Sequence, residues 1–162
     1  MTKSLNYKNK GFTLLEILLV VGIISILAGI IILAINPTKQ LGDTRNAQRR
    51  ADVLTIMNAI YQFSIDNHGN MDTINNGSTL PDGSGSTCAA NVGTDAKNLR
   101  DSLVGNDAVY LTDIPHDPSI SVFQSGDNTE YYVVQSSSTG RISVCAPDVS
   151  LETNNTAIQV TR

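Results

Sequence analysis

The chain has 162 residues, so one modest domain with an appendage is the expected organisation. Its formal net charge is −4, and hydrophobic residues make up 41% of it, many of them in one block between Phe12 and Ile35. The excess of acidic residues argues against non-specific binding of nucleic acid, which needs lysine and arginine to neutralise phosphates. The remainder is rich in Gly, Ser, Thr, Asn and Asp and builds only a small core.

The first predicted element is the apolar run from Phe12 to Ile35, whose only charged residue is Glu16. As a helix, its 24 residues reach about 36 Å, enough to cross a hydrocarbon core of about 30 Å. A charged side chain at mid-bilayer costs about 2.5–3.5 kcal/mol, so Glu16 must lie near an interface or find a partner. A removed secretory signal and a buried core helix are the alternatives. The run is long for a signal peptide, and the rest of the chain is too small and polar to surround a core helix.

The segment from Lys10 to Glu16, KGFTLLE, resembles the processing motif of type IV pilins and of the pseudopilins of type II secretion. In that family a prepilin peptidase cuts after the glycine and methylates the new amino terminus. The glutamate then pairs with that amine on a neighbouring subunit. The resemblance therefore implies cleavage between Gly11 and Phe12, N-methylation of Phe12, and an assembly role for Glu16.

The same resemblance implies a leader of residues 1–11, and prepilin peptidase and an assembly platform in the inner membrane as partners. Residues 12–36 form the transmembrane and assembly helix, surrounded by lipid before assembly, with the amino terminus in the cytoplasm and the head outside. The assembled product is an extracellular or periplasmic homopolymer that also takes up other pilins or pseudopilins. Charge alone does not fix this topology, because basic residues flank both ends of the run. Loss of the leader leaves 8 basic against 15 acidic residues.

A second helical pattern occupies residues 37–68, after Asn36-Pro37 interrupts the apolar run. Proline lacks a backbone donor and disfavours helix at the preceding residue, so we expect a kink or local melting near Ile35. The sequence predicts one long bent helix from Phe12 to about Asn67, stopped by Gly69, with charged residues set mostly away from its apolar face. That face combines two stripes at helical spacing, Ala47, Ala51, Leu54, Met57, Tyr61 and Ile65 beside Val53, Ile56, Ile60 and Phe63.

Residues 69–94 are rich in turn formers and are predicted to form a surface loop, followed by a short helix from Ala96 to Val104 that Thr94-Asp95 caps. Cys88 lies in this loop and Cys145 in a later strand. If the head is outside the cytoplasm, the two cysteines are expected to form a disulfide. A metal site is the alternative, and no nearby histidine supports it.

The segment from Tyr110 to Pro118, YLTDIPHDP, resembles the segment that precedes the sheet in many pilins and pseudopilins. In major pseudopilins Trp-Gly usually follows the Asp-Pro, whereas Ser119-Ile120 follows here. This departure favours a pilin over a major pseudopilin. Asp113, Asp117 and Asp127 are candidate oxygen ligands for calcium, the one cofactor considered, and solvated loop acids are the alternative interpretation.

The sheet is predicted from two β-rich runs, Glu130–Gln135 and Arg141–Ala146, joined as a hairpin by SSSTG, with further short strands at Val122-Phe123 and Ala157–Thr161. The predicted fold class is α+β, the pilin fold. The first half of a long kinked N-terminal helix spans the membrane. Its second half packs against a small antiparallel sheet in the head, residues 69–162.

The sequence does not predict an enzyme, because it contains no metalloprotease pair, zinc spacing, phosphate loop or dinucleotide turn. Three interpretations remain open. The favoured one is a structural subunit of a type IV pilus, which serves adhesion, twitching motility or DNA uptake. The others are a pseudopilin of a type II secretion system and a membrane-anchored binding head that does not polymerise.

Overall fold

A computed structural model describes residues 11–75, 78–83, 93–105, 109–120, 127–147 and 157–162. The chain divides into two compact units, Met1–Thr38 and Lys39–Arg162. The predicted strand at Val122-Phe123 and the predicted disulfide partner Cys88 lie outside the described residues.

The predicted apolar helix is α1, Leu14–Ala34. It begins after Thr13, whose side chain accepts a hydrogen bond from the backbone N–H of Glu16, and it ends at Ile35, which is extended at φ −95° and ψ 118°. The predicted interruption before Pro37 is confirmed. It divides the predicted single helix in two, because proline disfavours helical backbone at the residue before it.

The second helix is α2, Pro37–Asp66, and it begins on the proline itself, whose missing N–H is no loss at a first helical position. It ends where predicted, since Gly69 takes the left-handed conformation at φ 83° and donates to the carbonyl of Ser64 at 2.7 Å. Its buried face contains the whole second predicted stripe, Val53, Ile56, Ile60 and Phe63. The first stripe is largely outside the core, with Ala47, Ala51, Leu54 and Ile65 exposed.

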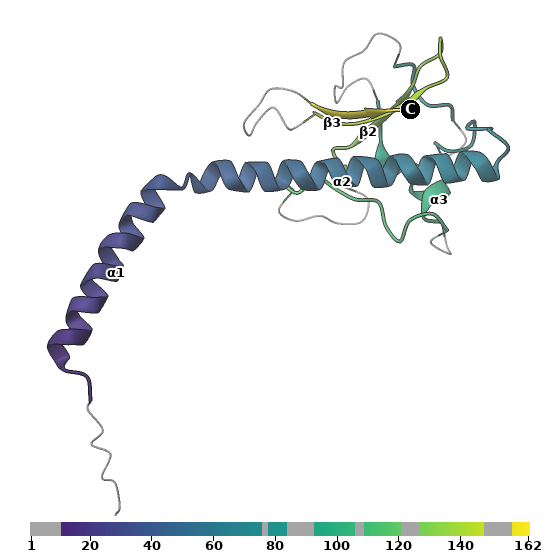
Figure 1. The fold of residues 1–162 in the computed structure, drawn as a ribbon. Coiled ribbons are helices and arrows are strands. Elements are labelled where there is room, and N and C mark those ends of the chain that lie inside the picture. Colours follow the sequence, from purple (N-terminus) through teal and green to yellow (C-terminus); the bar gives the residue numbers. More distant parts are fainter. Residues whose placement is uncertain (1–10, 76–77, 84–92, 106–108, 121–126, 148–156) are drawn as a thin grey trace, which may run out of the picture. The chain divides into compact units, whose positions relative to one another are not determined.

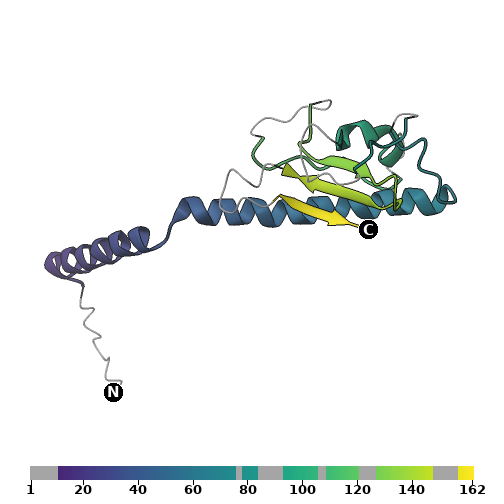
Figure 2. The same cartoon turned by 90° about the horizontal axis from the view of Figure 1, so that it is seen from above.

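The head contains a four-stranded antiparallel sheet in the order β1-β2-β3-β4 that lies along α2 (Figures 1 and 2). The strands are β1 Thr94–Asp95, β2 Tyr132–Gln135, β3 Ile142–Ala146 and β4 Ile158–Thr161. The predicted hairpin and the predicted last strand are confirmed, and β1 was not predicted. Val133, Val144 and Val160 stand opposite one another across β2, β3 and β4. Cross-strand pairs of β-branched residues stabilise the sheet. Val133 and Val144 belong to the same hydrophobic core as the apolar face of α2, and Val160 packs against that core.

The predicted short helix is present as a 3-10 helix, η1 Ala96–Leu99, continued by α3 Arg100–Leu103. Asp95 caps it as predicted, with its side chain accepting from the backbone N–H of Lys97. The described part of the predicted loop over residues 69–94 is irregular and mostly exposed up to residue 83, but it also contributes to the core. Three of its apolar residues, Met71, Ile74 and Leu80, are buried in the core, since a head with so few apolar residues recruits them wherever they occur.

Cys145 lies buried on β3 and is disulfide-bonded. Its pairing with Cys88 remains a prediction. We expect reduction to lower the free energy of unfolding of the head by about 4 kcal/mol, because a long loop in the unfolded chain is no longer closed. Urea unfolding of the purified subunit with and without reductant measures this. A variant with both Cys88→Ser and Cys145→Ser serves as the control and is expected to respond to urea identically under both conditions.

Candidate assembly site

The candidate assembly site is the start of α1, where the predicted cleavage point, Phe12 and Glu16 lie within the six residues 11–16. Gly11, Phe12 and Thr13 lie outside the helix, and Phe12 is 78% exposed. The backbone N–H of Glu16 donates to Thr13 Oγ1 at 3.2 Å, so the Thr-x-x-Glu pattern caps the helix. Gly11 and Phe12 are therefore exposed and lie ahead of a capped helix.

Glu16 is the acidic residue in the first turn of α1. The unpaired N–H groups of a helix N-terminus carry partial positive charge, so this position favours a carboxylate over any other in the helix. After cleavage at Gly11, a new amino group on Phe12 would lie only one turn away along the chain. The start of the apolar helix α1 thus carries the carboxylate of Glu16, and cleavage would add the amine of Phe12 beside it.

No residue of α1 is buried in the part of the chain that the structure describes. The helix is long and apolar enough to cross a membrane by length and composition. The hydroxyl of Ser25 donates to the carbonyl of Val21 at 2.8 Å, which satisfies that polar group without solvent. A surface of this kind requires lipid or other apolar helices around it.

The three candidate calcium ligands are not brought together. The described residues contain no group of three or more His, Cys, Asp or Glu side chains that could hold a metal ion. Asp113 pairs with Arg100 on the surface, Asp117 pairs with Arg49 in the interior, and Asp127 is exposed. Two of the three carboxylates already have an arginine as counter-charge, so this donor set does not fit the predicted calcium ion. The alternative interpretation of Asp117 as a solvated loop acid is wrong, because its side chain is buried.

The pair of Arg49 and Asp117 is a feature that the sequence reasoning missed. Both side chains are buried, with relative exposures of 1% and 0%, and they form two hydrogen bonds, Nε to Oδ2 at 2.6 Å and Nη2 to Oδ1 at 2.8 Å. Arg49 also donates to the side-chain oxygen of Asn46 at 2.9 Å, and Ser119 donates to Asp117 through its backbone N–H and its hydroxyl. Burial raises the pKa of Asp117, but the bonds from Arg49 and Ser119 outweigh it, and the net pKa is lower than usual.

A signal for this pair was present in the sequence. Arg49 and Asn46 lie four and seven residues before Val53, on the continuation of the buried stripe of α2. The expectation that Arg49 is set away from the apolar face is wrong, because a carboxylate 68 positions later in the chain satisfies its charge. Nothing local in the sequence identifies that partner.

Two more carboxylates, those of Asp52 and Asp95, form hydrogen bonds to the segment of residues 129–131. The hydroxyl of Tyr131, which is fully buried, donates to Asp52 Oδ2 on α2 at 2.8 Å. Burial raises the pKa of Asp52 above its ordinary value, with the bond from Tyr131 acting in the opposite direction. Asp95 accepts from the backbone N–H groups of Thr129 and Glu130, and so supports Glu130 in its left-handed conformation at φ 61°.

The described residues thus combine an exposed apolar N-terminal helix with an α+β head. Residues 6–32 match the model of the prokaryotic N-terminal methylation motif. The chain is also 36% identical over 61 residues to the type II secretion system core protein G of Escherichia coli (strain K12). The chain thus resembles the type IV pilin and pseudopilin family in its N-terminal methylation motif and in part of its length.

The similarity to the Escherichia coli protein is partial, since it covers 38% of this chain and 41% of the relative. No solved structure matches the chain. The comparisons therefore support the family, and the particular filament, its partners and its location are matters for proposal.

Proposed function

We propose that this protein is a structural subunit of a type IV pilus, assembled through its N-terminal helix after removal of residues 1–11. The observation that carries the proposal is Glu16, a single carboxylate one turn into a helix that is otherwise apolar and wholly exposed. In lipid this carboxylate is costly. The amine of Phe12 on an adjacent subunit supplies its counter-charge, and the pairing gains strength from the low dielectric of a helix bundle.

Before assembly, the subunit lies as a single-pass protein in the cytoplasmic membrane, with its amino terminus in the cytoplasm and its head outside. Assembly replaces lipid around α1 with the α1 helices of other subunits. The ion pair then fixes the register of the helices, which is the best-attested use of a buried charge pair. The expected partners are further copies of this chain, other pilins, prepilin peptidase and the assembly platform.

A pseudopilin of a type II secretion system is the second candidate, supported by the named relative in Escherichia coli. Two features favour the pilus. Ser119-Ile120 replaces the Trp-Gly that is usual in major pseudopilins, and Asp117 beside it is occupied by Arg49. Deletion of the gene distinguishes the two. Loss of surface fibres with normal export supports the pilus, and loss of exported enzymes with unchanged surface fibres supports the pseudopilus.

Processing provides the most direct test. We expect mass spectrometry of the mature protein to identify N-methylated Phe12 as its first residue, because Gly11 and Phe12 lie in an accessible segment ahead of α1. Gly11→Val is expected to retain the full leader, since a branched side chain replaces the hydrogen at the position that the peptidase reads. Lys8→Ala, in the leader, is the matched control and is expected to be cleaved. A wild-type protein that keeps its leader and stays monomeric would instead support the non-polymerising head.

A further inference from the structure

In the part of the chain that the structure describes, one edge of the last strand of the sheet has no neighbouring strand. In the described residues β4 pairs only with β3, at the end of the strand order. The backbone N–H and C=O of Arg162 bond to Ile142, so in this antiparallel register residues 158, 160 and 162 direct their backbone groups toward β3. The backbone groups of Gln159 and Thr161 are therefore directed outward, where a further strand would lie.

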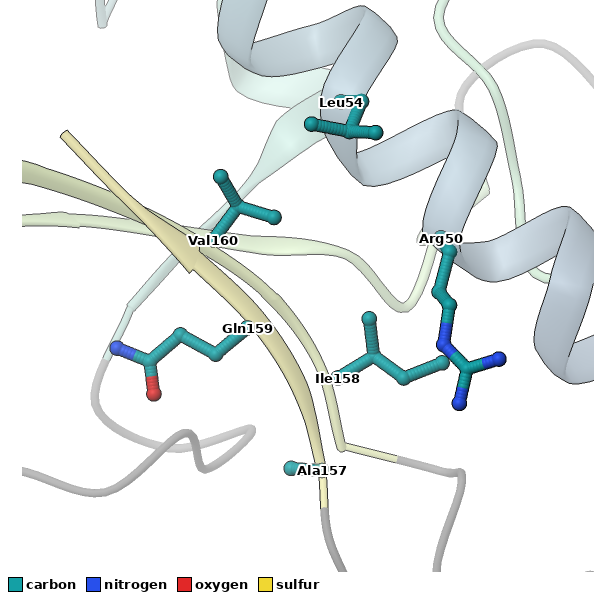
Figure 3. A pocket seen from close by; sticks show the side chains of 6 residues that line it. All are labelled: Arg50, Leu54, Ala157, Ile158, Gln159 and Val160. Atoms are coloured by element: carbon teal, nitrogen blue, oxygen red, sulfur yellow. The ribbon is translucent and has the colours of Figure 1, made fainter.

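A groove runs between this edge and α2. It has a volume of about 380 Å³ and is lined by Arg50, Leu54, Ala157, Ile158, Gln159 and Val160. Figure 3 shows the side chains of Ile158 and Val160 directed toward the helix, with Leu54 and Arg50 facing them from α2. Leu54 is 41% exposed, and the side chain of Arg50 makes no hydrogen bond or ion pair with any described residue. The sheet thus leaves Leu54, a residue of the first predicted stripe of α2, uncovered beside β4.

The edge strand is short, at 4 residues, which limits pairing, but its side chains add no further block. Sheet edges in isolated proteins are commonly blocked by proline, lysine, inward charges or bulges, because an unprotected edge pairs with other chains. The segment from Ala157 to Thr161, AIQVT, contains no proline and no charge, and it is rich in strand-forming residues. An edge of this composition is expected to be paired in the form in which the protein works.

We propose that the open edge of β4 accepts an extended segment of a neighbouring copy of this chain as a fifth strand, within the filament of the proposed function, on which this inference rests. Backbone bonds to Gln159 and Thr161 would hold the strand. Alternate apolar side chains would pack on Leu54 and Val160, and a carboxylate would meet Arg50. A second copy suits this site because the processed chain has 15 acidic against 8 basic residues, which complements the cationic groove.

The test uses the full-length protein in its own cells. The photo-crosslinking residue p-benzoylphenylalanine at position 54 is expected to give subunit–subunit adducts on irradiation, and the same residue at position 41, also exposed on α2, is the matched control. Gln159→Pro removes one outward N–H without touching a bond to β3. It is expected to lower the yield of adducts about tenfold and to abolish fibres, whereas Gln159→Ser leaves both unchanged.

Because a proline at an edge could also unfold the head, Arg50→Glu is the second variant. It alters no backbone group, and it is expected to lower the yield of adducts to a similar extent by repelling the incoming carboxylate. Normal fibres and normal adducts in both variants would overturn the fifth strand and leave the proposed function intact. Adducts without any wild-type fibres would support the contact and refute the pilus, and the absence of both would refute both.

Discussion

Cells that produce the Glu16→Ala variant are expected to insert and cleave the subunit normally but to assemble no fibres. Insertion is not impaired, because the substitution removes a charge that costs about 2.5–3.5 kcal/mol at mid-bilayer. Cleavage is not impaired either, because Gly11 and Phe12 are unchanged and the cap on α1 comes from the backbone N–H of residue 16, which alanine retains. What is lost is the only acidic partner within α1 for the amine of Phe12.

Three measurements follow this variant through its pathway. Membrane fractionation reports insertion, mass spectrometry of the amino terminus reports cleavage, and electron microscopy of sheared material reports fibres. Glu16→Gln separates charge from shape, since the amide keeps the size of the side chain and loses its negative charge. Leu15→Ala is the matched control, because Leu15 is an exposed apolar residue next to Glu16. Fibres in normal amount from Glu16→Ala would contradict the assigned role of Glu16.

The assembly site remains a prediction, and it rests on signals that are local in the sequence. A glycine and a phenylalanine ahead of a long apolar run, and a glutamate one turn inside it, are read from adjacent positions. The break before Pro37, the stop at Gly69 and the β-rich hairpin are also local, since each depends on the backbone preference of a few neighbouring residues. These are the parts of the fold that the structure confirms.

The interior of the head was less predictable because its contacts join distant segments. Periodicity marked two adjacent stripes on α2, and only the sheet determines that Val53 and Ile60 are covered while Leu54 and Ile65 are exposed. Composition marked residues 69–94 as loop, yet Ile74 in that segment is fully buried. Asp117 was one of several loop acids in the sequence, and its burial depends on Arg49, which is 68 positions away. A pattern of neighbours cannot supply such pairings.

The buried ion pair of Arg49 and Asp117 is expected to make a large contribution to the stability of the head. Asp117→Asn is expected to lower the free energy of unfolding of the head by about 3–5 kcal/mol, because it leaves the guanidinium of Arg49 in the interior without a counter-charge. Arg49→Met is expected to cost a similar amount for the converse reason. Asp113→Asn is the matched control. Asp113 and Arg100 form their pair on the surface, with side chains 58% and 39% exposed, and an exposed pair contributes at most about 1 kcal/mol.

The pH dependence gives an independent check with a definite sign. The pKa of Asp117 is lower in the folded protein than its ordinary value, because Arg49 and Ser119 hold the charged form. Its contribution to stability is therefore complete above the unfolded pKa of about 4 and is lost as the pH falls through the folded pKa. Asp52 acts in the opposite direction, since burial raises its pKa. The double difference, with Asp52→Asn as a common background, isolates Asp117 from Asp52, whose pKa the charge of Asp117 also raises, and it is expected to shrink only below about pH 4.

A double variant distinguishes stability from positioning. Replacing both partners, as Arg49→Met with Asp117→Leu, removes both charges at once, so its cost is expected to be well below the sum of the two single variants. If the pair only stabilises the head, this variant folds and assembles normally. If the pair also fixes the orientation of the head on α2, the variant folds but builds fewer fibres, because neighbouring heads must repeat the same orientation along a filament. Urea unfolding and fibre yield, measured on the same preparations, decide between the two outcomes. Additive single-variant costs would show that Arg49 and Asp117 do not act as a pair.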